Sequence, residues 1–203
     1  MNVFIKFRHI APWVVASFFI LSLGNCVSGN SGRTNVQPFS CVKDKSGTLI
    51  PGTPNVRMTT THCNDYVFTK ESVQKAIALF ATRYAESFDM SPLEVWELLR
   101  NLTIEVSAIP RTVQNVYDMQ GKFHKEPIPV TGLAMSPDLI WVEIKTSQVW
   151  SSSLTHELVH TIIWRTQKVH GDPDHEGDQF TGWSKKHTDF IKKFNNELMD
   201  LEI

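Results

Sequence analysis

The chain has 203 residues, of which 41% are hydrophobic and 20% charged. This composition is typical of one ordinary globular domain and excludes a fibrous or largely disordered chain. Its 20 Lys+Arg and 21 Asp+Glu give a formal net charge of −1, without a basic block or an acidic tail. We therefore expect no nucleic acid among its partners.

The N-terminus has the pattern of a secretory signal. Lys6 and Arg8 form a short positive region, and an apolar run follows over residues 10–23. This run is short and close to the N-terminus, so it predicts a signal peptide over residues 1–25 and not a membrane-spanning helix.

The end of this segment, Leu-Ser-Leu-Gly-Asn-Cys over residues 21–26, resembles the lipobox of bacterial lipoproteins. The resemblance implies lipid attachment at Cys26 and a location in the bacterial cell envelope, anchored at its periplasmic face or at the cell surface. Asn25 departs from the usual Gly, Ala or Ser, although the looser lipoboxes of some bacteria would admit it. In the alternative, a plain signal peptide is cleaved nearby and Cys26 is incidental.

Residues 26–40 are rich in small and polar side chains, which predicts a flexible tether. Residues 41–203 are then one domain. In an oxidising compartment Cys41 and Cys63 most simply form a disulfide, because they are the two cysteines left. The alternative is metal binding by both thiolates, an option that His62 keeps open.

The segment between these cysteines is predicted to lack helix and strand, because it contains Gly47, Pro51, Gly52 and Pro54. Two helices are expected next. One covers residues 71–88 with Thr69 as N-cap, and the other begins at the capping box of residues 91–94.

Residues 103–109 alternate and are rich in β-branched side chains, which predicts a strand. Residues 113–125 allow no assignment. Strands over 129–135 and 139–145 are expected to form a hairpin, because Ser-Pro-Asp separates them. A helix capped within 151–153, a loop over 170–183 and a final helix capped by Ser184 complete a two-layer α+β domain.

Residues 156–160 read HELVH, an HExxH motif. On a helix, His156 and His160 lie on one face a turn apart, so both imidazoles can bind one ion. Catalytic zinc takes three protein ligands and a water, and Glu157 can accept the proton of that water. The alternative is a helix with two surface histidines. A supporting feature is the apolar face of Val159, Ile162 and Ile163.

The motif and the loop after it resemble the zincin metallopeptidases, and predicted bacterial metallopeptidases in which a Gly-Asp-x-Asp loop precedes a histidine. Here that loop is Gly171, Asp172, Asp174 and His175. The resemblance covers the last third of the mature chain. It implies a zincin-like fold with a small mixed sheet, His175 as third ligand, and a peptide or protein substrate that pairs with a strand edge near the motif helix.

Loop reach alone also allows Glu176, Asp174 or Asp178 as the third ligand. His170 is a further candidate, either as a ligand or as a hydrogen-bond donor to the developing oxyanion.

The expected function is therefore zinc-dependent hydrolysis. Zinc lowers the pKa of its bound water, and Glu157 acts as general base. The resemblance points to a small cell-envelope metalloprotease. One alternative is a non-catalytic zinc-binding surface lipoprotein, an adhesin or an interaction module. Another is a chance motif in a structural protein of the envelope.

Overall fold

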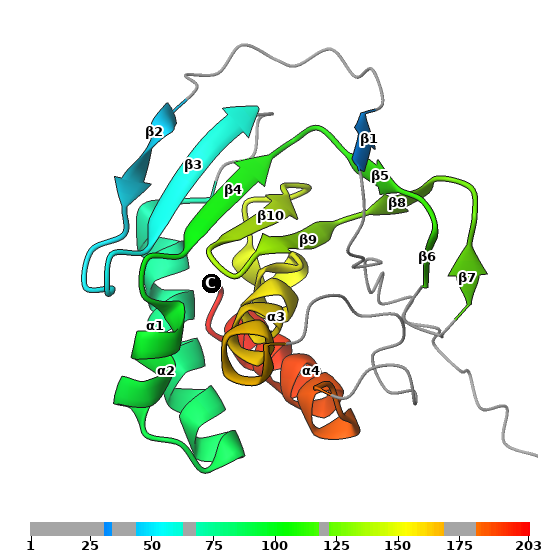
Figure 1. Ribbon diagram of the computed structural model, residues 1–203. Coiled ribbons are helices and arrows are strands. Elements are labelled where there is room, and N and C mark those ends of the chain that lie inside the picture. Colours follow the sequence, from blue (N-terminus) through cyan, green and yellow to red (C-terminus); the bar gives the residue numbers. More distant parts are fainter. Residues whose placement is uncertain (1–30, 34–43, 63–67, 118–121, 169–181) are drawn as a thin grey trace, which may run out of the picture.

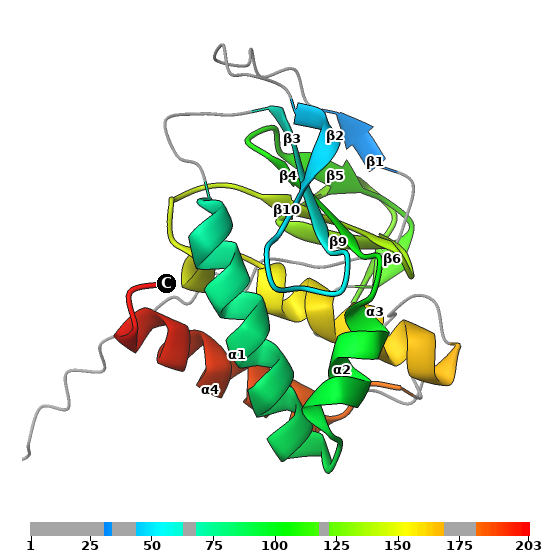
Figure 2. The ribbon, with the colours of Figure 1, turned by 90° about the vertical axis from the view of Figure 1, so that its left-hand side faces the viewer.

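The computed structural model describes residues 31–33, 44–62, 68–117, 122–168 and 182–203. They form an α+β domain with two layers, and Figures 1 and 2 show the four α-helices on one side of the main sheet. The predicted fold class is therefore confirmed at this level.

The main sheet has five strands in the order β2-β3-β4-β10-β9. They are β2 (Asp44–Leu49), β3 (Arg57–His62), β4 (Thr103–Ser107), β9 (Gly132–Ser136) and β10 (Leu139–Glu143). Strands β3, β4 and β10 run parallel, whereas β2 and β9 are antiparallel to their neighbours. The sheet is therefore mixed, with an antiparallel strand at each end of its order.

Short strands form two smaller sheets. One joins β1 (Ser31–Arg33), β5 (Arg111–Val113) and β8 (Ile128–Val130), and the other pairs β6 (Val116–Tyr117) with β7 (Phe123–His124). Along β10, Ile140 and Val142 pack in the main core, whereas Trp141 packs in a second cluster with Val113, Val130 and Leu133. Alternate side chains of β10 thus serve two cores, as expected for a strand covered on both faces.

One prediction about the first part of the chain needs correction. The segment between Cys41 and Cys63 contains β2 and β3, because its glycines and prolines lie mainly in the connecting turn and pairing with β4 stabilises the strands. Within the predicted tether of residues 26–40, three residues form β1, since they pair with β5. The signal segment, Cys26, Cys41 and Cys63 lie outside the described residues.

The first two helices match the sequence prediction. Helix α1 (Lys70–Phe88) begins at Thr69, whose hydroxyl oxygen accepts a hydrogen bond from the Ser72 main chain. Helix α2 (Pro92–Leu99) begins with the capping box of Ser91 and Glu94. Both caps satisfy N–H groups that the first turn of a helix leaves without partners.

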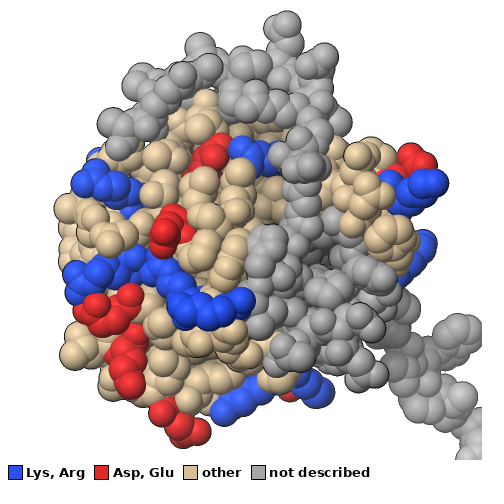
Figure 3. Space-filling model, viewed as in Figure 1, with Lys and Arg blue, Asp and Glu red and all other residues tan. Residues whose placement is uncertain are grey.

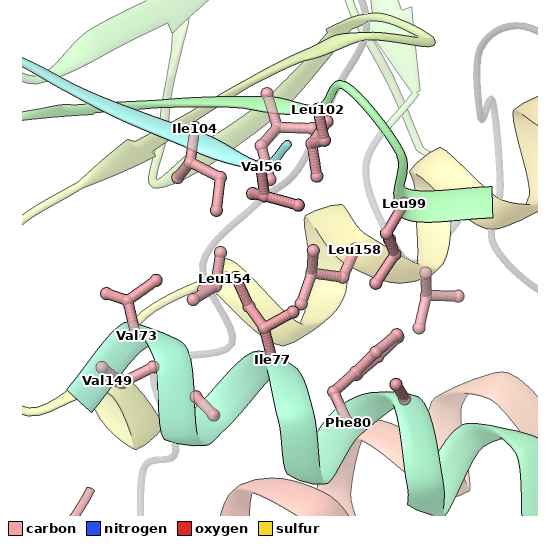
Figure 4. Packing of buried hydrophobic residues seen from close by; sticks show 14 of the residues in the cluster. Val56, Val73, Ile77, Phe80, Leu99, Leu102, Ile104, Val149, Leu154 and Leu158 are labelled. Atoms are coloured by element: carbon pink, nitrogen blue, oxygen red, sulfur yellow. The ribbon is translucent and has the colours of Figure 1, made fainter. Parts of the chain in front are cut away.

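The apolar faces of the helices meet the sheet in one core. Phe80 of α1 is fully buried and lies 5.6 Å and 5.7 Å, between ring centroids, from Phe190 and Phe194. Figure 4 shows Phe80, Ile77 and Leu158 lying between α1 and the motif helix, with Ile104 of β4 above them. The two helices are thus fixed against the same sheet.

The predicted hairpin is present but shifted. Strands β9 and β10 are antiparallel and joined at Ser136-Pro137-Asp138, whereas residues 128–130 form β8 of the other sheet. The prediction of one strand over 129–135 is therefore wrong in its first half. The reason is that β8 pairs with β5, a contact distant in sequence.

The last two helices are α3 (Leu154–Gln167), which carries the HExxH motif, and α4 (Lys185–Asp200). A 3₁₀ turn, Val149–Ser151, precedes α3. Ser184 begins α4 as predicted. Ser153 precedes α3 but does not cap it, because its hydroxyl donates to the Thr131 carbonyl at 2.6 Å instead. That bond ties the start of α3 to the start of β9.

Arg165 anchors the other end of α3. Its guanidinium donates to the carbonyls of Leu98 and Arg100 at the end of α2, and to the Pro137 carbonyl and the Asp138 carboxylate in the β9–β10 turn. A planar guanidinium with five N–H donors can make these bonds at once, which lysine cannot. The motif helix is therefore fixed to both layers.

We expect Arg165→Ala to lower the free energy of unfolding by about 2–3 kcal/mol, because several carbonyls lose a charged donor. Urea unfolding measures this loss. The matched control is Arg100→Ala. The Arg100 side chain is half exposed and pairs with Glu97 of the neighbouring turn, so that loss should be much smaller. Equal losses in the two variants would contradict the anchoring role.

None of the helices that the structure describes is both long and apolar enough to cross a membrane.

Candidate functional site

The two motif histidines converge as the sequence predicts. His156 and His160 lie on one face of α3, and their Nε2 atoms are 2.9 Å apart. His156 is buried and His160 is half-buried. Because α3 also buries Val159, Ile162 and Ile163, its position is fixed by the core rather than by the histidines. The core therefore holds the two imidazoles close together.

Trp183, just before α4, covers this pair. Its ring centroid lies 4.9 Å from that of His156 and 4.8 Å from that of His160. The indole N–H donates to the Thr188 hydroxyl at 3.0 Å, which fixes the ring. An apolar wall of this kind lowers the local dielectric around the two imidazoles and so strengthens their electrostatic interactions.

Glu157 lies on the adjacent side of α3 and is fully buried. Its carboxylate lies against the main chain of Gly132 at the start of β9, since a Cβ on that glycine would be 2.1 Å from Glu157 Oε1. The motif thus places its histidines beneath Trp183 and its carboxylate against the end strand of the sheet. Sequence spacing alone predicts the histidine pair but does not reveal this strand contact.

The predicted third ligand, His175, lies outside the described residues, as do the alternatives Glu176, Asp174, Asp178 and His170. Among the residues that the structure describes, no three His, Cys, Asp or Glu side chains form a group able to hold a metal ion. The identity of the third ligand therefore stays a prediction.

A third histidine, His187 on α4, is close to the pair, and the sequence pattern did not reveal it. Its ring lies 5.7 Å from Trp183 and stacks on Phe88 at 4.5 Å, between centroids. The main-chain N–H of Ser184 donates to its Nδ1 at 3.0 Å, so the neutral ring carries its proton on Nε2. The sequence feature that could have identified it is its position three residues after Ser184, the serine at the start of α4.

The pKa of His187 is lowered to about 4, mainly by burial, and the nearby positive charges of Lys186 and His160 contribute to the same shift. An unfolded histidine has a pKa of about 6.5. Between these two values the unfolded chain binds a proton that the folded chain does not. Folding stability is therefore complete above the unfolded pKa and falls as the pH drops towards the folded one.

We expect the metal-free protein to lose about 2 kcal/mol more stability than His187→Gln between about pH 6.5 and pH 4, because the variant lacks this group. Urea unfolding at several pH values, with chelator present, measures the difference. Titration of the histidines that do not interact with His187 cancels in the comparison. If the free energy of unfolding had the same pH dependence in the two proteins, the lowered pKa of His187 would be contradicted.

Charge on the surface does not single out a partner. In the view of Figure 3, the acidic and basic side chains of the described residues are interspersed over one face of the domain.

No protein-family model matches the chain, and neither a curated protein nor a solved structure does.

Proposed function

We propose that the protein is a zinc-dependent hydrolase, and specifically a small metalloprotease of the bacterial cell envelope. The observation that carries the proposal is the convergence of His156 and His160, with the buried carboxylate of Glu157 one residue away on the same helix. The two imidazoles can supply two of the three protein ligands of a catalytic zinc, and the carboxylate can act as general base.

The donor set fits zinc. Two nitrogens bound to tetrahedral zinc at 2.0–2.1 Å lie about 3.3 Å apart. The observed separation of 2.9 Å between the two Nε2 atoms differs from this by a few tenths of an ångström. Small rotations of the two imidazole side chains can make up this difference without any movement of the α3 main chain. His156 and His160 would therefore be two of the ligands, with His175 proposed as the third.

Zinc, Glu157 and Trp183 would have different roles in the reaction. Zinc, when bound, supplies a Lewis acid that polarises a carbonyl and lowers the pKa of water. Glu157 takes a proton from the attacking water and passes it to the leaving amine. Trp183 limits the access of bulk water to the two histidines.

A peptide substrate is favoured by the position of β9. This strand ends the main sheet, and its pairing with β10 uses one of its two edges. Extended peptides commonly bind by adding main-chain hydrogen bonds to such an edge. Because Glu157 lies against Gly132, a peptide along β9 would pass the proposed base. A mixed sheet with an antiparallel end strand beside the motif helix also supports the resemblance to zincins.

The location and the anchor form part of the proposal. Residues 1–25 direct export, and Cys26 holds the lipid that keeps the domain at the membrane surface. A disulfide between Cys41 and Cys63 fits the same oxidising compartment. The competing proposal is a surface lipoprotein that binds zinc without turnover. A fully buried glutamate beside the histidines is not needed by such a protein.

A peptide-library digest tests the function. The zinc-loaded protein is expected to cleave a subset of peptides, chelated protein is expected to cleave none, and added zinc should restore cleavage. Cleavage that survives complete removal of metal would contradict the proposal. A zinc-loaded protein that cleaves no peptide in a diverse library would favour the non-catalytic lipoprotein.

A further inference from the structure

The motif helix and the sheet approach each other closely at Gly132. A Cβ on this residue would lie 2.1 Å from Glu157 Oε1, 2.4 Å from Ser153 Oγ and 2.8 Å from Glu157 Cδ. Real Cβ atoms essentially never have contacts below 3.0 Å. The carboxylate of Glu157 and the hydroxyl of Ser153 thus occupy the space that any other residue would fill with its side chain.

We propose that Gly132 is a positioning residue for Glu157, whose carboxylate is held against the bare main chain of β9. The inference rests on the proposed role of Glu157 as general base. Gly132 itself need not touch any substrate atom. It acts by leaving the space in which the base lies.

The strand cannot retreat from the helix to relieve a clash. Gly132 pairs with Val142 of β10, and the main-chain N–H of Glu143 donates to the Thr131 carbonyl at 2.8 Å. That carbonyl also accepts the Ser153 hydroxyl. Since β10 lies inside the sheet, between β4 and β9, the main chain at residues 131–132 is held from two directions.

An added methyl group must therefore displace a side chain. The atom nearest to it is the far end of Glu157, so the carboxylate moves first. The histidines are not among the three atoms nearest to the added Cβ, and zinc binding should persist. A base displaced by about 1 Å loses its alignment with the water, which costs on the order of tenfold to a hundredfold in kcat.

The first arm of the test measures folding and needs no activity. Urea unfolding of the metal-free, full-length protein gives the cost of Gly132→Ala in three backgrounds: wild type, Glu157→Gln and Glu157→Ala. Glutamine keeps the bulk of the side chain, so the cost should be unchanged. Alanine removes that bulk, so the cost should fall by about half or more, a coupling typical of residues in contact.

The second arm measures hydrolysis and zinc content. Gly132→Ala should keep its zinc and lose about tenfold to a hundredfold in kcat, with a smaller change in KM. The matched control is Gly47→Ala on β2, at the opposite end of the sheet order. Gly47 has a φ of 72°, so alanine there is strained and destabilises the fold without touching the site.

Equal costs of Gly132→Ala in all three backgrounds would overturn the inference, whatever the activity. Coupling accompanied by an unchanged kcat would also overturn it, because the carboxylate would then be touched but not misplaced. A wild-type protein that neither binds zinc nor hydrolyses peptides would refute the proposed function instead. In that case the unfolding measurements still decide whether Gly132 positions Glu157.

Discussion

Glu157→Gln is expected to lower the rate of peptide hydrolysis by several orders of magnitude while the protein keeps its zinc. Glutamine has nearly the same size and shape, so it fits the fully buried position against Gly132. Its amide cannot accept a proton from water at neutral pH. General base catalysis contributes about 10²–10⁴-fold, so kcat/KM should fall by that factor. Zinc content and peptide cleavage, measured on one preparation, check both halves of the expectation.

The matched control is Glu143→Gln, which makes the same chemical change at a partly buried glutamate of β10. Burial raises the pKa of Glu143, so this carboxyl group also differs from a surface one. Activity should nevertheless stay close to wild type, because Glu143 is not on the motif helix. Full activity in Glu157→Gln would remove the general base from the account.

His160→Ala is expected to remove the metal itself. Zinc held by imidazoles owes most of its affinity to the number of protein ligands, and the loss of one should weaken binding by more than about a hundredfold. The fold should survive, since His160 is half-buried and α3 is held by its apolar face and by Arg165. Zinc titration of the metal-free protein, followed by circular dichroism, separates loss of binding from unfolding.

The control for this variant is His124→Ala, which removes a histidine from β7 of the small hairpin. Its zinc affinity should equal that of wild type. The same titration applied to His175→Ala, Glu176→Gln and His170→Ala identifies the third ligand, which is expected to be His175. If His160→Ala bound zinc with wild-type affinity, the zinc site would have to lie elsewhere in the protein.

Local signals explain why much of the fold was predictable. The capping residues Thr69 and Ser91 and the apolar periodicity of α1 and α4 depend on neighbours in sequence, and the structure has these helices where they were expected. The glycines and prolines of residues 47–54 predicted a segment without strands, and this prediction was wrong. Strands β2 and β3 exist because β3 pairs with β4, which is about 45 residues further along the chain.

The part of the site that could be predicted from the sequence is likewise the part that depends on local spacing. The spacing of His156 and His160 places both on one helical face, whatever the rest of the fold. The contacts of Gly132, Trp183 and His187 depend on how α3 meets β9 and α4, and no local pattern specifies that packing. Ser153 shows the limit clearly: its sequence position indicates an N-cap, but its hydroxyl bonds to Thr131 across the layers.

The central claim is that His156 and His160 bind a catalytic zinc ion. Metal analysis of the purified protein, before and after chelation, tests it most directly when peptide cleavage is followed on the same samples. We predict a single zinc per chain, whose removal stops cleavage and whose return restores it. A folded protein that takes up no zinc at micromolar concentration, or that keeps cleaving without it, would contradict the claim.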